Sequence, residues 1–221
     1  MKDRITRDAL SIGLATGVYA VSFGVLAVSA GFSVAQTCVM SLAAFTGASQ
    51  FSFVSVVAAG GGAAAALPPA LLLGARNGVY ALSLKRILRG GWAGHARDAH
   101  LVIDETTAMA HAQDDPVRGR RAFLAAAASV FAFWNAGTLL GAVAGTGLGD
   151  PRDLGLDAIF PAVFLALLVP QLRRAGAVPA ALGGAAIGAI LLPIAAPGVP
   201  VMASALAAIP VLVLARRRSA P

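Results

Sequence analysis

The chain has 221 residues, of which 58% are hydrophobic and 12% are charged, and its formal net charge at pH 7 is +7. Because soluble domains average roughly 25% charged residues, this composition is typical of a membrane protein. A single cysteine excludes a disulfide framework, and the sequence has no C-x-x-C motif for a zinc or redox site. The basic residues flank apolar runs, as in oriented membrane proteins, and therefore do not indicate nucleic-acid binding.

Charged residues are missing from four long runs, which cover residues 9–75, 122–149, 158–172 and 175–215. A membrane-spanning helix needs about 20 predominantly apolar residues, whereas the strands of a membrane β-barrel alternate in polarity at every second residue. The sequence therefore predicts an all-α polytopic membrane protein with about seven transmembrane segments. We expect a single transmembrane domain over residues 1–221.

The first half of this domain, about residues 9–88, contains three predicted segments. The first is expected at about 9–30 and is too long for the apolar region of a secretory leader. The second is expected at about 34–59 and is closed by three consecutive glycines. The third is predicted to begin near Pro68 and Pro69, because proline is favourable in the first turn of a helix.

A polar connector, residues 89–121, separates the halves, and the second half, about 122–215, holds four more predicted segments. We place these segments at about 122–145, from Asp157 to Arg174, at 177–194 and at 199–214. The first of them carries Gly137, Gly141 and Gly145 at a spacing of four residues. This spacing predicts a smooth stripe that packs closely against another helix.

The two halves also share a weak pattern. Residues 23–32 of the first half have a counterpart in residues 137–149 of the second, and each is followed by further apolar segments. Three segments per half, plus one extra helix, would make the halves inverted repeats, as is common in secondary transporters. Alternatively, alanine- and glycine-rich helices resemble one another through composition alone.

The distribution of basic residues predicts which loops face the cytoplasm. With seven crossings and the carboxyl end inside, twelve basic residues lie inside and four lie outside. If one early segment is re-entrant, the amino end moves inside and the count becomes fifteen to one. Both versions place residues 85–121 and the carboxyl end in the cytoplasm, and the side of residue 1 stays open.

The stretch from Ala44 to Ser55 is the most informative part of the sequence, because Gly47, Ser49 and Gln50 interrupt an apolar helix. An unpaired amide in hydrocarbon costs on the order of several kcal/mol. Broken helices at membrane depth are tolerated inside protein or around a wet cavity, and transporters place their substrates there. The alternative is that Gly47 and Ser49 only allow two helices to pack closely.

Arg76 lies inside the third segment, where an arginine costs roughly 2.5–3.5 kcal/mol and therefore needs a partner. The candidate partners are Asp104, Glu105 or the carboxylate of a bound substrate, which a guanidinium can bind with two hydrogen bonds. Alternatively, the segment tilts or ends early, and Arg76 reaches the membrane surface.

The adjacent acids Asp104 and Glu105 are candidate proton carriers, because partial burial raises the pKa of a carboxyl group. Their alternative interpretation is a pair of acids at the start of a solvated helix. Asp157 precedes an apolar segment and is a third candidate, although it could simply cap that helix.

Other chemistries have no support in the sequence. The three histidines lie in the connector without a metal-ligand spacing, and Gly-Lys never occurs, so a phosphate-binding loop for ATP is absent. The sequence has no serine nucleophile motif either. We therefore expect neither an enzyme nor a bound metal or cofactor.

Six motifs occur in an order that resembles the AzlC family of branched-chain amino acid permeases, the large subunits of two-component exporters. They are F-G-V-L-A-V-S-A-G-F, M-S-L-A-A-F-T-G-A-S-Q-F, R-x-x-x-Y-A-L-S-L, D-E-T, G-T-L-L-G and L-G-L-D-A-I-F-P-A-V-F-L-A-L-L. The resemblance covers about residues 10–175, and its most specific parts are G-A-S-Q-F and L-G-L-D-x-x-x-P-A.

The resemblance implies export of leucine, isoleucine, valine and methionine across the bacterial inner membrane, driven by protons, with a small AzlD-type membrane subunit as partner. By matched position, the motif residues are Gly47, Ser49, Gln50, Phe51, Arg76, Asp104, Glu105, Asp157 and Pro161. The chain departs from the family motif N-x-R-H, because Gly74 stands in place of the asparagine and Asn77 in place of the histidine.

These residues suggest how a zwitterion such as leucine could be held. Phe51 offers an apolar wall, Arg76 can meet the carboxylate, and an acid can meet the ammonium group; we include Asn77 among the substrate-binding candidates. Two alternatives remain open: a membrane scaffold or partner subunit without transport activity, and an exporter of another small metabolite.

Overall fold

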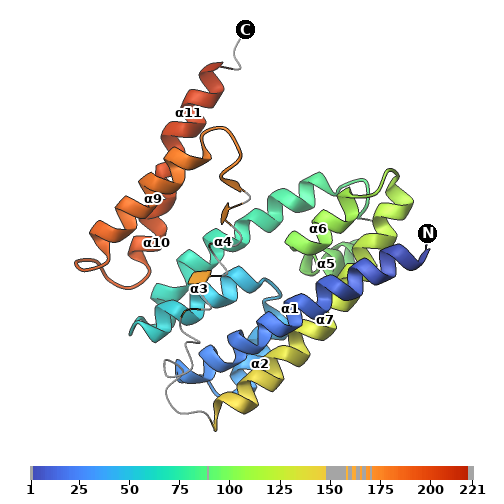
Figure 1. The fold of residues 1–221 in the computed structure, drawn as a ribbon, viewed down its shortest axis with the longest axis horizontal. Coiled ribbons are helices and arrows are strands. Elements are labelled where there is room, and N and C mark those ends of the chain that lie inside the picture. Colours follow the sequence, from blue (N-terminus) through green and yellow to red (C-terminus); the bar gives the residue numbers. More distant parts are fainter. Residues whose placement is uncertain are drawn as a thin grey trace.

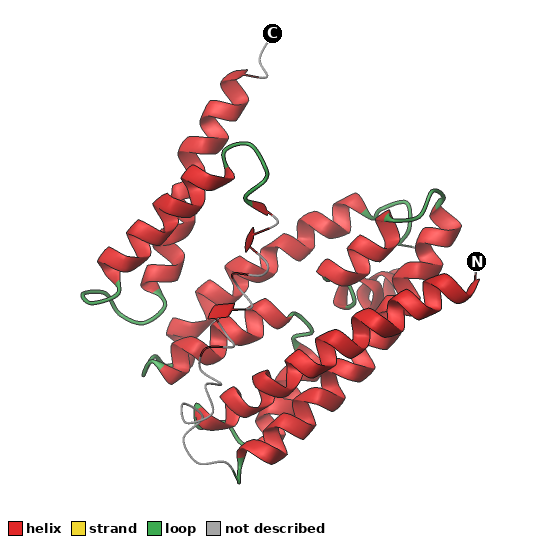
Figure 2. Cartoon of the chain, viewed as in Figure 1, coloured by secondary structure: helices red, strands yellow, loops and turns green. Residues whose placement is uncertain are grey.

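A computed structural model describes residues 2–88, 90–147 and 171–218, together with the isolated positions 158, 161–162, 165 and 168–169. All regular elements in these residues are helices (Figure 2). Asp157 and several residues of the fifth predicted segment lie outside the described residues. The prediction of an all-helical protein is therefore confirmed for the part of the chain that the structure describes.

Two long helices, α1 (Lys2–Ser29) and α7 (Pro116–Gly145), pack along almost their whole length (Figure 1). Within the described residues, they are the two helices that are both long and apolar enough to cross a membrane. Asp115 begins α7 by accepting hydrogen bonds from two backbone amides of the first turn, each 2.9 Å long, as an N-cap residue should. This pair forms one side of the molecule.

The predicted glycine stripe of α7 forms the contact with α1. A Cβ atom on Gly137 would overlap the carbonyl of Gly17, and one on Gly141 would overlap the carbonyl of Val21. Glycine is required here because the two backbones touch, which is the physical basis of small-residue packing in membranes. We refer to this contact as the glycine seam.

Contacts along the glycine seam advance in the same direction on both helices, so α1 and α7 are parallel. The predicted inversion of the two halves is therefore wrong for the helices that begin them. The reason lies in the second predicted segment, residues 34–59, which does not form one continuous helix.

Residues 34–59 form a hairpin of two short helices, α2 (Val34–Ala43) and α3 (Gly47–Ala58). At 1.5 Å per residue they are about 15 and 18 Å long, whereas the hydrocarbon core is about 30 Å thick. The helix α2 runs antiparallel to α7, with Ser41 donating to the Thr138 hydroxyl at 3.1 Å. The chain then turns back, so the hairpin enters and leaves at the same end of the molecule.

The long helix α4 (Ala63–Ser83) runs antiparallel to α3 and returns the chain to the end where α1 begins (Figure 1). Its expected start near Pro68 was five residues too late. The alanines before Pro68 are strong helix formers, and Gly60, with φ of +85°, ends the preceding helix instead. The prolines therefore lie in the second turn, and the carbonyl of Ala65, which cannot bond to Pro69, lies against Gly198.

The connector folds into two short helices, α5 (Trp92–His100) and α6 (Asp104–His111). Met109 of α6 packs in one buried cluster with Ile5 and Ala9 at the start of α1. The amino end and the connector therefore lie at the same end of the molecule, as expected if an early segment is re-entrant.

The carboxyl-terminal part folds as a second hairpin, which packs on α4 through α10 (Figure 1). It consists of α9 (Ala177–Leu191), α10 (Val199–Ser204), a 3-10 turn (Ala205–Ala207) and α11 (Ala208–Arg218). The sixth predicted segment matches α9, and the seventh matches α10, the 3-10 turn and α11 taken together.

Candidate functional site

The break between α2 and α3 lies inside the protein and is braced by Gln50. The Gln50 amide nitrogen donates to three carbonyl oxygens at the end of α2: Ala44 at 2.8 Å, Met40 at 3.3 Å and Ser41 at 3.4 Å. Helix ends leave four carbonyls without intrahelical partners, and Gln50 satisfies some of them. Because this residue is only 1% exposed, its polar group is stable there only through these bonds.

Trp134 of α7 completes this arrangement. Its indole nitrogen donates to the Gln50 side-chain oxygen at 3.1 Å, and its ring lies across Gly47, where a Cβ atom would collide with it. Tyr19 of α1 stacks on Phe51 with ring centroids 4.8 Å apart. The hairpin apex is thus held by α1 and α7, and Gly47 is required because an aromatic ring covers it.

A cavity of about 220 Å³ lies at the hairpin apex, between α3, α4, α6 and α7. We call it the polar pocket. This volume is below the roughly 300–1,000 Å³ of pockets that bind drug-sized ligands, so it suits a small molecule or the polar part of one. The pocket is lined by Tyr19, Phe45, Thr46, Gly47, Ala48, Arg76, Ile103, Asp104, Glu105, Val130 and Trp134.

Arg76 and Asp104 form an ion pair across the polar pocket, with Nη2 and Oδ2 2.7 Å apart. Both side chains are 32% exposed, and Tyr80 donates its hydroxyl to the other Asp104 oxygen at 2.7 Å. The partner predicted for Arg76 is therefore present. The helix α4 continues for seven residues beyond Arg76 to Ser83, so the segment does not end early at this residue.

Glu105 follows Asp104 in the first turn of α6 and also lines the polar pocket. Burial raises the pKa of this carboxyl group, and the neighbouring Asp104 charge raises it further, whereas its own backbone amide and Arg76 act in the opposite direction. A carboxyl group with a raised pKa can bind and release a proton closer to neutral pH. The pocket thus combines a permanent cation with two acids in different environments.

The first turn of α3 supplies further polar groups to the polar pocket. Thr46 precedes the helix without a side-chain cap, and Gly47 and Ala48 line the cavity. Amide groups in the first turn of a helix lack intrahelical partners, and the helix dipole favours negative charge there. This end of the pocket can therefore accept a carboxylate.

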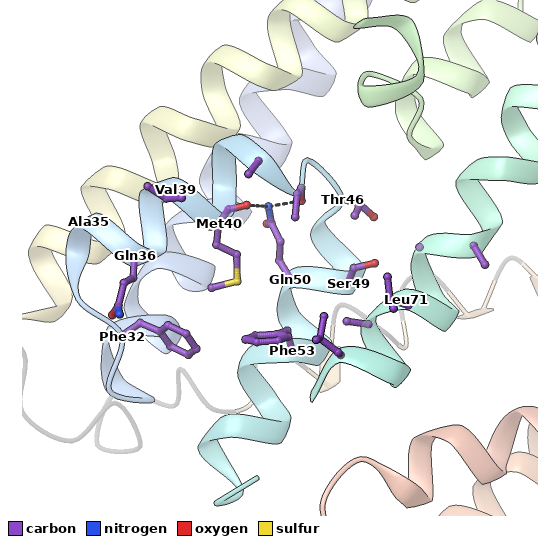
Figure 3. A pocket seen from close by; sticks show the side chains of 16 residues that line it. Phe32, Ala35, Gln36, Val39, Met40, Thr46, Ser49, Gln50, Phe53 and Leu71 are labelled. Atoms are coloured by element: carbon purple, nitrogen blue, oxygen red, sulfur yellow. Dashed lines mark hydrogen bonds between the residues drawn. The ribbon is translucent and has the colours of Figure 1, made fainter. Parts of the chain in front are cut away.

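A larger cavity of about 900 Å³ lies on the other side of the hairpin apex, between α2, α3 and α4 (Figure 3). We call it the lateral groove. Its walls are mainly apolar, and Gln50 and Ser49 point into the region between the helices (Figure 3). It is lined by Phe32, Ala35, Gln36, Val39, Met40, Ala43, Ala44, Thr46, Ser49, Gln50, Phe53, Leu67, Ala70, Leu71, Gly74 and Ala75.

The structure brings four of the predicted site residues together at the polar pocket: Gly47, Arg76, Asp104 and Glu105. Ser49 and Gln50 line the lateral groove. The other three candidates lie elsewhere. Phe51 belongs to the buried aromatic core, Asn77 has a buried side-chain oxygen without a hydrogen-bond partner in the described residues, and Asp157 lies outside those residues.

Sequence reasoning did not include Trp134 and Tyr19 among the candidate site residues. Both lie at mid-helix positions around the polar pocket, and Trp134 is only 5% exposed. The signal was available, because a lone tryptophan in the middle of an apolar segment needs a partner for its N–H group.

The fold and the pocket define a helical membrane protein in which a hairpin of two short helices places a charged cavity among apolar helices. The model of the family described as AzlC protein matches residues 11–148. The chain belongs to the AzlC family.

Curated relatives agree with this assignment. Inner membrane protein YgaZ of Escherichia coli is 30% identical over 200 residues, which cover 85% of this chain and 81% of the relative. Uncharacterized membrane proteins from Archaeoglobus fulgidus and Helicobacter pylori are 30% and 27% identical; each alignment covers 75% of this chain, and 74% and 73% of the relatives. No solved structure matches the chain significantly.

Proposed function

We propose that the protein exports branched-chain amino acids (leucine, isoleucine, valine and also methionine) across the bacterial inner membrane. The observation that carries this proposal is the polar pocket, which combines the Arg76–Asp104 ion pair, Glu105 and the first turn of α3 at a helix break. A zwitterion needs partners for both of its charged ends, and this pocket offers both within apolar and aromatic walls.

In the proposed complex, the substrate carboxylate lies between the first turn of α3 and the Arg76 guanidinium, and the ammonium group lies near Asp104. The substrate then competes with the Arg76–Asp104 pair, whose two side chains are partly exposed and able to rearrange. When the pocket is empty, each of these two charged groups has the other as its partner, 2.7 Å away.

We further propose that transport is coupled to protons through Glu105. The raised pKa of this carboxyl group keeps its proton to a higher pH than an ordinary glutamate, and its position in the pocket lets its charge influence a bound ammonium group. Asp104 and Asp157 remain the other candidates for this role.

We propose that the hairpin of α2 and α3 is re-entrant, which leaves six of the seven predicted crossings and puts both ends of the chain on one side. The distribution of basic residues supports the cytoplasm as that side, because fifteen then lie inside and one lies outside. We propose this orientation for one transmembrane domain over residues 1–221, working with a small AzlD-type membrane subunit.

The proposal is tested by efflux from cells loaded with leucine- or valine-containing dipeptides, with and without this chain and its partner gene. Arg76→Ala should abolish export while the protein still inserts at normal abundance. The matched control is Arg86→Ala, which removes an exposed arginine just after the end of α4 and should leave export unchanged.

Unchanged efflux in Arg76→Ala would contradict the role of the polar pocket. If efflux does not depend on this chain at all, although the partner requires it for insertion, the protein is a membrane scaffold. The medium of cells with and without the gene can also be compared. If a different metabolite is exported, the polar pocket stays the proposed binding site, but the proposed substrate is wrong.

A further inference from the structure

We propose that the side chain of the substrate enters the lateral groove and that Gly74 determines which side chains fit. This inference rests on the amino acid export proposed above, and it adds the position of the apolar end of the substrate and a residue that sets specificity.

The polar pocket and the lateral groove are neighbours that share one wall. Thr46, at the start of α3, lines both cavities. On α4, Gly74 and Ala75 line the groove, whereas the next residue, Arg76, lines the pocket. A molecule held by Arg76 therefore has the groove within one turn of α4.

The remaining walls of the polar pocket offer little room for an aliphatic side chain. Phe45 and Trp134 are each 5% exposed and belong to the packed aromatic core, together with Val130. A pocket of about 220 Å³ that already holds two charged ends of a ligand has limited space left. The apolar groove of about 900 Å³ can take the side chain without displacing this core.

Gly74 and Ser49 both line the lateral groove, and Gly74 lies two residues before Arg76 of the polar pocket. A Cβ atom built on Gly74 would lie 3.2 Å from the Ser49 hydroxyl oxygen, with no other atom within 4 Å of it beyond the immediate backbone. The Ser49 hydroxyl is buried and has no hydrogen-bond partner in the described residues. One methyl group added at residue 74 would therefore reduce the space in the lateral groove at a single, identified contact.

Backbone conformation does not explain the glycine at position 74. The glycines with positive φ lie elsewhere in the described residues, at 31, 60, 90, 176 and 198. Gly74 lies in the interior of α4, where glycine is less favourable than alanine. Space at the contact with Ser49 is the remaining explanation, and space is what a passing side chain needs.

The test compares the export rates of valine, leucine and methionine in cells that carry Gly74→Ala. Valine branches at its first side-chain carbon, so its methyl groups stay close to its carboxylate and ammonium groups. The longer side chains of leucine and methionine would extend further into the lateral groove. One methyl group in an apolar site changes discrimination about tenfold or more. We expect the leucine-to-valine and methionine-to-valine ratios to fall by about that factor.

A second variant keeps the test decisive if Gly74→Ala perturbs packing. The double variant Ser49→Ala, Gly74→Ala removes the one atom that the new methyl group would approach, and it should restore the leucine-to-valine ratio. The matched control is Gly78→Ala on the same helix, where an added Cβ meets no atom within 4 Å; its ratios should equal those of the wild type.

Equal loss of all three substrates in Gly74→Ala at normal protein abundance would overturn the proposal, because the groove would then hold a structural partner such as another membrane helix. Unchanged ratios would also overturn it. A wild-type protein that exports none of the three amino acids would instead refute the proposed function itself, so the two failures are distinguishable.

Discussion

Two aspartate–arginine contacts in the connector region use the same chemistry in opposite ways. Asp98 of α5 is 0% exposed and accepts hydrogen bonds from Arg97 and from Arg120 of α7, the latter with Nη2 and Oδ1 3.1 Å apart. Asp104 of α6 is 32% exposed and forms an ion pair with Arg76, and both side chains line the polar pocket. The first aspartate is enclosed by protein, and the second faces a space that a ligand can enter.

The pKa of Asp98 reflects this enclosure. Burial alone would raise it, but the hydrogen bonds and charges of Arg120 and Arg97 outweigh burial and lower the pKa below its ordinary value. Arg120 also lies over the Phe123 ring, 5.7 Å from its centroid. The comparison teaches that an ion pair between helices becomes a candidate site through the space beside it, since both pairs consist of the same two types of side chain.

The largest expected effect is on stability, in Asp98→Asn. This change leaves Arg120 charged and without its partner, and breaking a buried ion pair costs about 3–5 kcal/mol. Unfolding in detergent should occur at a much lower temperature, while export per folded molecule stays near the wild-type value. Asp114→Asn, at an exposed connector position, is the control and should melt like the wild type.

The same pair predicts an acid dependence of stability. Because the folded-state pKa of Asp98 is lowered, its contribution is complete above the ordinary carboxyl pKa, about 4, and is lost as the pH falls further. Asp98→Asn should lack this part of the acid-induced loss. Parallel acid titrations of the two proteins would contradict the role of Asp98.

The next effect concerns activity, in Asp104→Asn. Its ion pair is partly exposed, and such pairs contribute about 0–1 kcal/mol to stability, so the unfolding temperature should change little. Export should nevertheless fall by about tenfold or more, because one charged partner of the zwitterion is lost. If Asp104→Asn instead unfolds at a much lower temperature and exports normally per folded molecule, Asp104 has a structural role like that of Asp98, and the prediction is wrong.

Glu105→Gln should change the pH dependence of export more than its maximum rate. The raised pKa means that the folded state retains a proton that the unfolded state loses, so stability falls as the pH rises from the ordinary value of 4.5 through the folded-state pKa. The glutamine variant should avoid this fall and should export at a rate that no longer follows the proton gradient. An unaltered pH profile of export would contradict the proposed role of Glu105 in proton coupling.

The smallest effect is expected in Tyr80→Phe, which removes the hydroxyl that donates to Asp104. The net contribution of a typical hydrogen bond is about 0.5–1.5 kcal/mol. Export should fall severalfold and the unfolding temperature should stay nearly constant. A fall as large as that of Asp104→Asn would show that Tyr80 itself contacts the substrate.

Much of the fold follows from the sequence because charge-free runs and glycine spacing report directly on helices and their contacts. The glycine stripe at 137, 141 and 145 predicted a close contact with another helix, which the structure identifies as α1, and the missing charges predicted the membrane class. The direction of the chain after residue 34 could not be read in the same way. A hairpin of two short apolar helices and one long apolar helix have almost the same hydropathy, and only the break at residues 44–46 distinguishes them.

The site was predictable where a residue is costly in a membrane. Arg76 required a partner, and Asp104 was one of two acids suggested for it. The role of Gln50 could not be predicted, because whether an amide meets a ligand or a free carbonyl depends on the exact end of α2. Gly74 was noticed as a departure from a family motif, but its contact with Ser49 depends on the register between α3 and α4.

The glycine seam has a consequence for how the molecule can move. Two helices whose backbones are in contact at glycines cannot slide or rotate against each other without steric collision, so we expect α1 and α7 to move as one rigid body. Any change of access must then come from other elements, such as the hairpin of α2 and α3, which packs on α1 and α7, and α4, which packs on α3. A spectroscopic label pair across α1 and α7 should report one fixed separation throughout the cycle, whereas a pair across α2 and α4 should report two.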